Sequence, residues 1–139
     1  MRKLFFICIA FGLLLQGISC SLNDDSPNFH FTPLQITNAE VPESFELNET
    51  YQVSVNYIIP DGCTFFSGFD VSKVDTTVRN VAVFGMVQTD EEACITLAEE
   101  AQASFDFICL YDEPYTFRFW QGENADGEQE YLEIVVPVK

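Results

Sequence analysis

The feature that most constrains the fold is a regular alternation of apolar and polar side chains between residues 51 and 59. Tyr51, Val53, Val55, Tyr57 and Ile59 fall on every second position, and polar residues occupy most of the positions between them. Because successive side chains of a β-strand point to opposite faces of a sheet, this pattern predicts a half-buried strand. The residues that follow, 60–62, read Pro-Asp-Gly and favour a turn, since proline presets one backbone angle and glycine accepts a positive φ.

The C-terminal part of the chain shows the same period twice. Residues 115–120 alternate aromatic with other side chains, and residues 131–138 place Leu, Ile and Val on alternate positions. The segment between them, 121–129, is rich in Gly, Asn, Asp and Glu, so the two strands are predicted to form a hairpin with an acidic tip. Pro137 favours an edge position for the last strand, because proline cannot donate to a neighbouring strand.

The remaining strands are predicted with less regular patterns. Residues 78–87 are apolar on both faces, which is typical of a central strand, and the segment 93–103 is predicted to be a connection with at most one or two helical turns. Further short strands are predicted at 34–36 with 44–47, at 64–71 and at 104–110. About seven short strands separated by turns indicate an all-β sandwich.

Residues 1–20 have the layout of a secretory signal. Two basic residues are followed by about a dozen apolar residues, then by small residues at positions 17 and 19 and by Cys20. The apolar run is shorter than the roughly 20 residues that span a bilayer. We therefore predict a cleaved signal peptide at 1–19, a lipid attachment site and flexible tether at 20–33, and a folded domain at 34–139.

The residues around Cys20 resemble the lipobox of bacterial lipoproteins, in which the cysteine after the cut receives a diacylglyceryl group. Ile18 and Ser19 fit that pattern, whereas Gly17 stands where the family usually has Leu, Val or Ile. The resemblance implies that a lipid at the N-terminus makes the membrane a partner, and that the protein lies in the cell envelope on the outer membrane. The acidic pair Asp24-Asp25 resembles a short signal for export to the cell surface. The alternative is an ordinary signal peptide and an unmodified Cys20 in a periplasmic or secreted protein.

A second resemblance concerns the fold. Residues 113–120 resemble the penultimate strand of bacterial immunoglobulin-like domains, in which a tyrosine, here Tyr115, follows a tight corner. Residues 131–138 fit the last strand of such domains. The resemblance implies an immunoglobulin-like β-sandwich of about seven antiparallel strands. Many members have a cysteine two residues after this tyrosine, and this chain has Phe117 there. In this respect it resembles the members that lack the intersheet disulfide.

The charge of the chain argues against nucleic acid as a partner. After the leader, 22 acidic residues face only Lys73, Arg79, Arg118 and Lys139, so the formal charge of that part is −18. Binding to phosphates needs clustered Lys and Arg. Positive partners and divalent cations are compatible with this charge, and so is a simple role of the acidic surface in solubility.

Five cysteines occur, and their pairing depends on Cys20. Cys8 leaves with the leader, and acylation of Cys20 would leave Cys63, Cys94 and Cys109. We predict a disulfide between Cys63 and Cys94, because both follow turn-like stretches, with Cys109 buried as a small hydrophobe. A bridge between Cys94 and Cys109 is the alternative, and four cysteines would allow two bridges if Cys20 carries no lipid.

No catalytic set is recognisable. His30 is the single histidine, it lies in the predicted tether, and no zinc-ligand spacing or glycine-rich phosphate loop surrounds it. We therefore predict a protein that is not an enzyme and needs no cofactor: a noncatalytic binding or structural module. Its partner would be a protein or a glycan. A hydrolase that uses paired carboxylates is an alternative.

The predicted hairpin carries two candidate sites. Its acidic loop matches most of an EF-hand loop, but Gly122 at the first ligand position has no side-chain oxygen. Glu123, Asp126 and Glu128 are therefore only weak calcium candidates, and a calcium-stabilised secreted module is a second alternative. Trp120 is the sole tryptophan and a candidate contact for a carbohydrate or a protein; packing against its neighbours is the other interpretation.

Overall fold

The computed structural model describes residues 28–90 and 93–139. The leader, Cys20 and most of the predicted tether lie outside these residues, so the predictions about cleavage and lipid attachment are not addressed by the fold. The described residues form eight strands: β1 Phe29–Leu34, β2 Ile36–Glu40, β3 Thr50–Ile59, β4 Thr64–Asp75, β5 Val78–Gln88, β6 Glu99–Ile108, β7 Tyr115–Glu123 and β8 Gln129–Val136.

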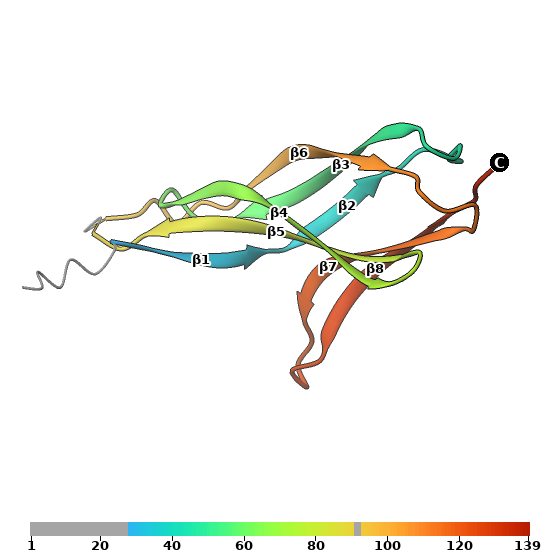
Figure 1. Cartoon of the computed structure of the whole chain (residues 1–139). Coiled ribbons are helices and arrows are strands. Elements are labelled where there is room, and N and C mark those ends of the chain that lie inside the picture. Colours follow the sequence, from blue (N-terminus) through green and yellow to red (C-terminus); the bar gives the residue numbers. More distant parts are fainter. Residues whose placement is uncertain (1–27, 91–92) are drawn as a thin grey trace, which may run out of the picture.

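The strands form two sheets that pack as a sandwich, which confirms the predicted all-β architecture (Figure 1). In the five-stranded sheet, β4 pairs with one edge of strand β5. The other edge of β5 pairs with β1 over one part of its length and with β7 over another. Strand β8 lies outside β7, at the sheet edge that Pro137 predicts. The three-stranded sheet has the order β2-β3-β6.

Strand β3 follows the predicted alternation. Val53, Val55 and Tyr57 are buried between the sheets, and the polar positions lie on the outer face. There the hydroxyl groups of Ser54 and Ser104 on β6 are hydrogen-bonded at 2.9 Å. The period-2 pattern of residues 51–59 therefore does set which face of the second sheet is buried.

The prediction of antiparallel pairing throughout is wrong at one place. Strands β5 and β7 pair in parallel, from Val78↔Thr116 to Val81↔Phe119. Parallel neighbours need a long crossover, and here the connection passes through β6 in the other sheet before β7 returns. The strand count is eight rather than about seven, and the immunoglobulin-like class stays a prediction.

The tether is shorter than the predicted range 20–33. Strand β1 begins at Phe29 and pairs with β5 from Phe29↔Gln88 to Leu34↔Val83. The backbone carbonyl of Asn28 also accepts a hydrogen bond from the N–H of Thr89 at 2.8 Å. These bonds come from a strand about fifty residues later, so no local pattern signals them. The described fold begins eight residues after Cys20.

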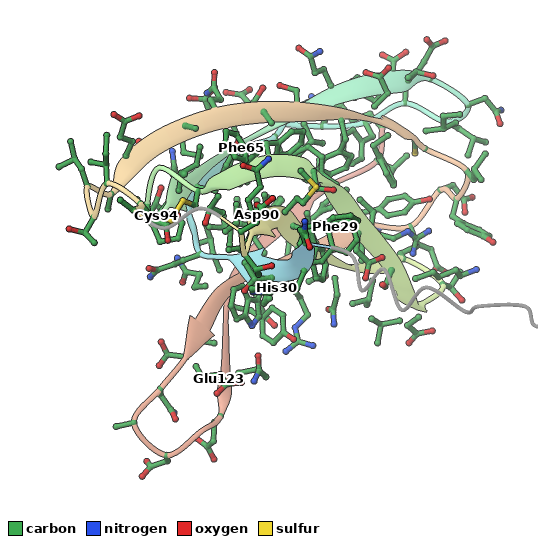
Figure 2. The ribbon with its side chains drawn as sticks, turned by 90° about the vertical axis from the view of Figure 1, so that its left-hand side faces the viewer. Phe29, His30, Phe65, Asp90, Cys94 and Glu123 are labelled. Carbon is green, nitrogen blue, oxygen red and sulfur yellow. A yellow bond between two sulfur atoms is a disulfide. The ribbon has the colours of Figure 1, made fainter. Side chains whose placement is uncertain are left out.

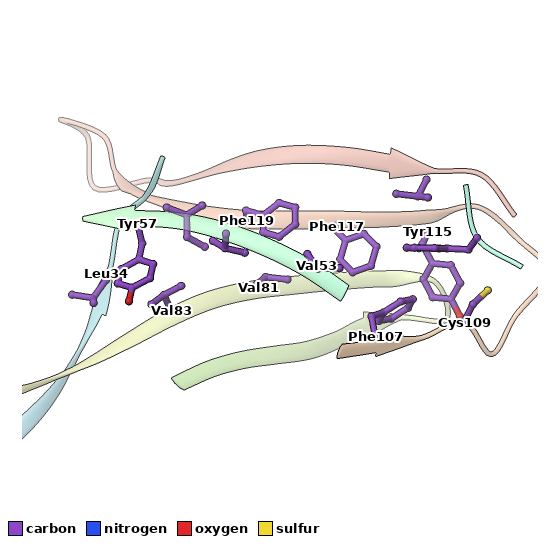
Figure 3. Close-up of a cluster of buried hydrophobic side chains, with 14 residues drawn as sticks. Leu34, Val53, Tyr57, Val81, Val83, Phe107, Cys109, Tyr115, Phe117 and Phe119 are labelled. Atoms are coloured by element: carbon purple, nitrogen blue, oxygen red, sulfur yellow. The ribbon is translucent and has the colours of Figure 1, made fainter. Parts of the chain in front are cut away.

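Aromatic rings fill the centre of the sandwich (Figure 3). The ring of Phe107 on β6 lies 5.0 Å from those of both Tyr115 and Phe117 on β7. The buried hydroxyl group of Tyr115 accepts hydrogen bonds from the backbone N–H groups of Leu110 and Tyr111, each at 3.1 Å. A tyrosine that fixes the preceding corner in this way is a feature of immunoglobulin-like sandwiches. The corner predicted at Tyr115 is thus present.

Candidate functional site

The outer face of β7 carries Trp120. The alternation of this strand buries Tyr115, Phe117 and Phe119, and it turns Arg118 and Trp120 away from the core. The indole is half-buried, because neighbouring strands of the same sheet flank it. The side chain thus packs on its neighbours and also reaches the surface, and its role as a contact stays a prediction.

Trp120 lies beside a second aromatic residue. The β7–β8 pairing makes Trp120 and Tyr131 direct cross-strand partners, so both rings stand on the same outer face. The two rings line a hollow of about 170 Å³, which we call the Trp120 hollow. Strands β4 and β5 complete its lining with Asp70, Ser72, Asn80, Val81 and Ala82.

Hydrogen bonds and stacking position the two rings. The indole Nε1 of Trp120 donates to Oε1 of Gln129 at 2.5 Å. The guanidinium of Arg118 lies 4.3 Å from the ring centroid of Tyr131, and its Nε donates to Oε1 of Glu133 at 2.9 Å. Because each ring is tied to a neighbouring strand, the walls of the hollow are positioned before any ligand arrives.

The polar lining consists of Asp70, Ser72 and Asn80. The hydroxyl of Ser72 lies 3.0 Å from both carboxylate oxygens of Asp70 and donates to that group. The Oδ1 atom of Asn80 is buried and has no hydrogen-bond partner among the described residues. Leaving a buried acceptor unpaired costs about 1–3 kcal/mol. The unpaired Oδ1 atom of Asn80 therefore lies beneath the surface of the hollow and does not face a ligand.

The hairpin tip is a turn that is closed by its own hydrogen bonds. The side-chain oxygen of Asn124 accepts from the N–H groups of Asp126 and Glu128, each at 2.9 Å. Gly127 has a φ of 78°, the left-handed conformation that short hairpin loops require. The predicted β-hairpin is therefore confirmed, with a loop at 124–128 that is shorter than the predicted 121–129.

Two of the three calcium candidates have separate side-chain partners at this tip. The Glu123 carboxylate accepts from Gln129 at 2.6 Å, and the Glu128 carboxylate accepts from Asn124 at 3.1 Å. In the part of the chain that the structure describes, no three Asp, Glu, His or Cys side chains gather as a metal-binding group. The positions of these carboxylates add no support to calcium binding, which stays a prediction.

The predicted disulfide between Cys63 and Cys94 is present, with a Cα–Cα distance of 5.4 Å. It ties the start of β4 to the segment before β6. Cys109 is free and fully buried, as predicted, and its thiol donates to the backbone oxygen of Tyr111 at 3.4 Å. Burial raises the pKa of the Cys109 thiol, although this hydrogen bond acts in the opposite direction.

Exposed aromatic side chains mark the end of the molecule at which β1 begins. Figure 2 looks onto this end and shows Phe29, Phe65, Asp90 and Cys94 there, with Glu123 on the projecting hairpin. Phe29 and Phe31 are exposed, with ring centroids 5.6 Å apart. His30 stands between them on β1 rather than in a tether.

Sequence reasoning found Trp120 but missed the residues that surround it. Tyr131 was predictable as its neighbour, because the register of a predicted hairpin pairs residues near its tip. Asn80 is one of three polar residues in β5, with Arg79 and Gln88, so its type alone does not mark it as part of a site. Asp70 and Ser72 carry no signal either, since only the β4–β5 register brings them to the hollow.

Among residues 28–90 and 93–139 there is no helix long and apolar enough to cross a membrane. Comparisons of the chain with protein-family models, with curated proteins and with solved structures find no match.

Proposed function

We propose that this chain is a lipid-anchored lipoprotein of the cell envelope, and that its folded part is a noncatalytic binding module. The leader and Cys20 point to the anchor, and the outer face of the five-stranded sheet supplies a surface for binding. The observation that carries the proposal is the state of the other cysteines.

The three cysteines within residues 28–90 and 93–139 are accounted for without Cys20. Cys63 and Cys94 are bonded to each other, and Cys109 is 0% exposed within the core. A leftover cysteine in an exported protein needs an explanation, such as an intermolecular bridge or a modification. Acylation explains it here, because Cys20 directly follows a leader that resembles a lipobox.

The short distance from Cys20 to the fold supports a peripheral anchor. Eight residues extend at most about 29 Å, so the start of β1 would stay close to the lipid surface. One acyl chain holds a protein only weakly, whereas two or more hold it firmly. The net negative charge keeps the folded part in water, since anionic headgroups repel it.

The Trp120 hollow supports a binding role. Its side chains come from four neighbouring strands of one sheet, so their relative positions are fixed by backbone pairing. Sites on such rigid elements need little ordering when a ligand binds. A protein or a glycan contact at Trp120 therefore fits a module that stands outside the membrane.

Fractionation of cells that produce a Cys20→Ser variant tests the anchor. We expect the wild-type protein in the membrane fraction, resistant to high salt and released by detergent, and the variant in the soluble fraction. Cys8→Ser is the matched control, because that cysteine lies in the leader, and it should behave as wild type. Membrane retention of Cys20→Ser equal to that of wild type would overturn the proposal.

A further inference from the structure

The geometry points to a specific ligand chemistry for the Trp120 hollow: a primary ammonium group at the end of an alkyl chain. This inference rests on the proposed function, because it names what the binding module would recognise. Two sources offer this group, namely a lysine side chain of a basic partner protein and a free alkylamine.

The lining of the hollow suits a cation. Trp120 and Tyr131 present electron-rich rings, and a cation within about 6 Å of such a ring is attracted to its face. The Asp70 carboxylate adds a negative charge at the same place. The Ser72 hydroxyl, which also lines the hollow, offers a further acceptor, and an ammonium group carries three donors.

The guanidinium of Arg118, a residue that pairs with Asn80 across β5 and β7, does not fill this role. Arg118 stacks on Tyr131 and pairs with Glu133, and it is not among the residues that line the hollow. Arg118–Glu133 is also the only ion pair within residues 28–90 and 93–139. The charge of Asp70 is therefore left for a ligand to neutralise.

Size and overall charge narrow the choice of ligand. A cavity of about 150 Å³ holds one benzene-sized molecule, so the hollow of about 170 Å³ admits one small group. A single sugar ring is of similar size. The formal charge of −18 after the leader decides between them, because it attracts cations, repels anions and is indifferent to a neutral sugar.

The fluorescence of Trp120 gives a direct readout, because it is the sole tryptophan of the whole chain. The mature protein, from whichever cell fraction holds it, is purified in an uncharged polyoxyethylene detergent, which carries neither an amine nor a sugar. It is then titrated with butylammonium chloride, with butanol and with glucose. We expect a saturable change with butylammonium at millimolar concentration and none with butanol or glucose. High salt should weaken the response, because it screens the attraction.

Two variants that each remove one negative charge distinguish binding in the hollow from a general attraction of cations to the acidic surface. Asp70→Asn should weaken butylammonium binding about two- to fivefold, the range for an exposed charge pair. Asp126→Asn on the hairpin tip should leave it unchanged. Asp70 is exposed, so the variant should keep its fold, which circular dichroism verifies. Equal affinities of wild type and Asp70→Asn, or an equal response to butanol or glucose, would overturn the inference.

A lysine-rich unstructured peptide and its fully acetylated form distinguish the two sources. Tighter binding of the lysine peptide than of butylammonium, with loss on acetylation, would identify a basic protein as the source. Equal binding of the two amines would identify a free alkylamine. These titrations do not depend on the state of Cys20, so their failure is separate from a failure of the lipid anchor.

Discussion

At the scale of single residues, the buried hydroxyl group of Tyr115 stabilises the corner that precedes β7. It satisfies two backbone N–H groups at the corner between β6 and β7. Tyr115→Phe leaves both donors without their acceptor, and we expect the free energy of unfolding to fall by about 1–3 kcal/mol. Urea denaturation monitored by circular dichroism measures this change.

Tyr51→Phe is the matched control for that variant. The Tyr51 hydroxyl accepts a single hydrogen bond, from the N–H of Glu46 at 2.8 Å, at a half-buried position that water reaches. The loss should therefore be smaller than for Tyr115→Phe. An equal or larger loss for Tyr51→Phe would show that the corner has no special weight.

Because the thiol of Cys109 is buried, we expect the free energy of unfolding to fall at alkaline pH. Its pKa is raised above 9.0 by burial, so above that pH the unfolded chain loses this proton before the folded chain does. The stability that Cys109 contributes is therefore complete below pH 9.0 and declines as the pH rises through the folded-state pKa. The difference in unfolding free energy between wild type and Cys109→Ala should narrow over that range. A constant difference would contradict the raised pKa.

At the scale of elements, the disulfide fastens the start of β4 to the segment before β6. Cys63 and Cys94 are 31 residues apart, so closing this loop restricts the unfolded chain by about 3–4 kcal/mol in the chain-entropy model. Replacing both cysteines with alanine should lower the free energy of unfolding by about that amount, as measured by chemical denaturation. A loss near zero would show that the bridge adds little beyond the sheet pairing.

Strand β5 is flanked by β4 on one edge and by β1 on the other. The side chains of Thr64 on β4 and Leu34 on β1 pack over Gly85 of β5. A Cβ at Gly85 would lie 2.9 Å from Cγ2 of Thr64 and 3.0 Å from Cδ1 of Leu34, both buried side chains. Gly85→Ala should therefore destabilise the fold by about 1–3 kcal/mol through overpacking. Gly62→Ala, whose nearest contact is an ordinary 3.4 Å, is the control, and an equal effect of the two would contradict this explanation.

The strands that the sequence predicts well are those with one buried face. Strands β3, β7 and β8 alternate clearly because one side packs on the core and the other meets water. Strand β6 begins at Glu99, before the predicted 104–110, because its first residues pair with Ile59 and Ile58 although they are polar. Local composition there predicts a connection, and only the partner strand explains the extension.

Long-range pairing is what the sequence does not encode locally. The start of β1 at Phe29 and the parallel β5–β7 contact both depend on strands that are distant in the chain. The candidate site follows the same division. Trp120 was visible as an outward aromatic residue, whereas Asp70 joins it through the register of three strands.

At the scale of the whole molecule, the two ends of the sandwich differ. The described chain begins at the end that carries the exposed Phe29, Phe31 and Phe65, and the C-terminus lies at the opposite end of the long axis (Figure 1). The β7–β8 hairpin projects from the body, with the Trp120 hollow at its base. An anchor at Cys20 would thus hold the aromatic end toward the lipid surface.

The intact mass of the protein isolated from its native membranes tests the proposed anchor most directly. We expect a chain that begins at Cys20, heavier by more than one acyl chain and lighter by the two hydrogens lost at Cys63 and Cys94. Reduction should restore those hydrogens and leave the lipid in place, since a thioether resists reduction. A mass that still includes residues 1–19, or one that shows an unmodified Cys20, would contradict the lipid anchor.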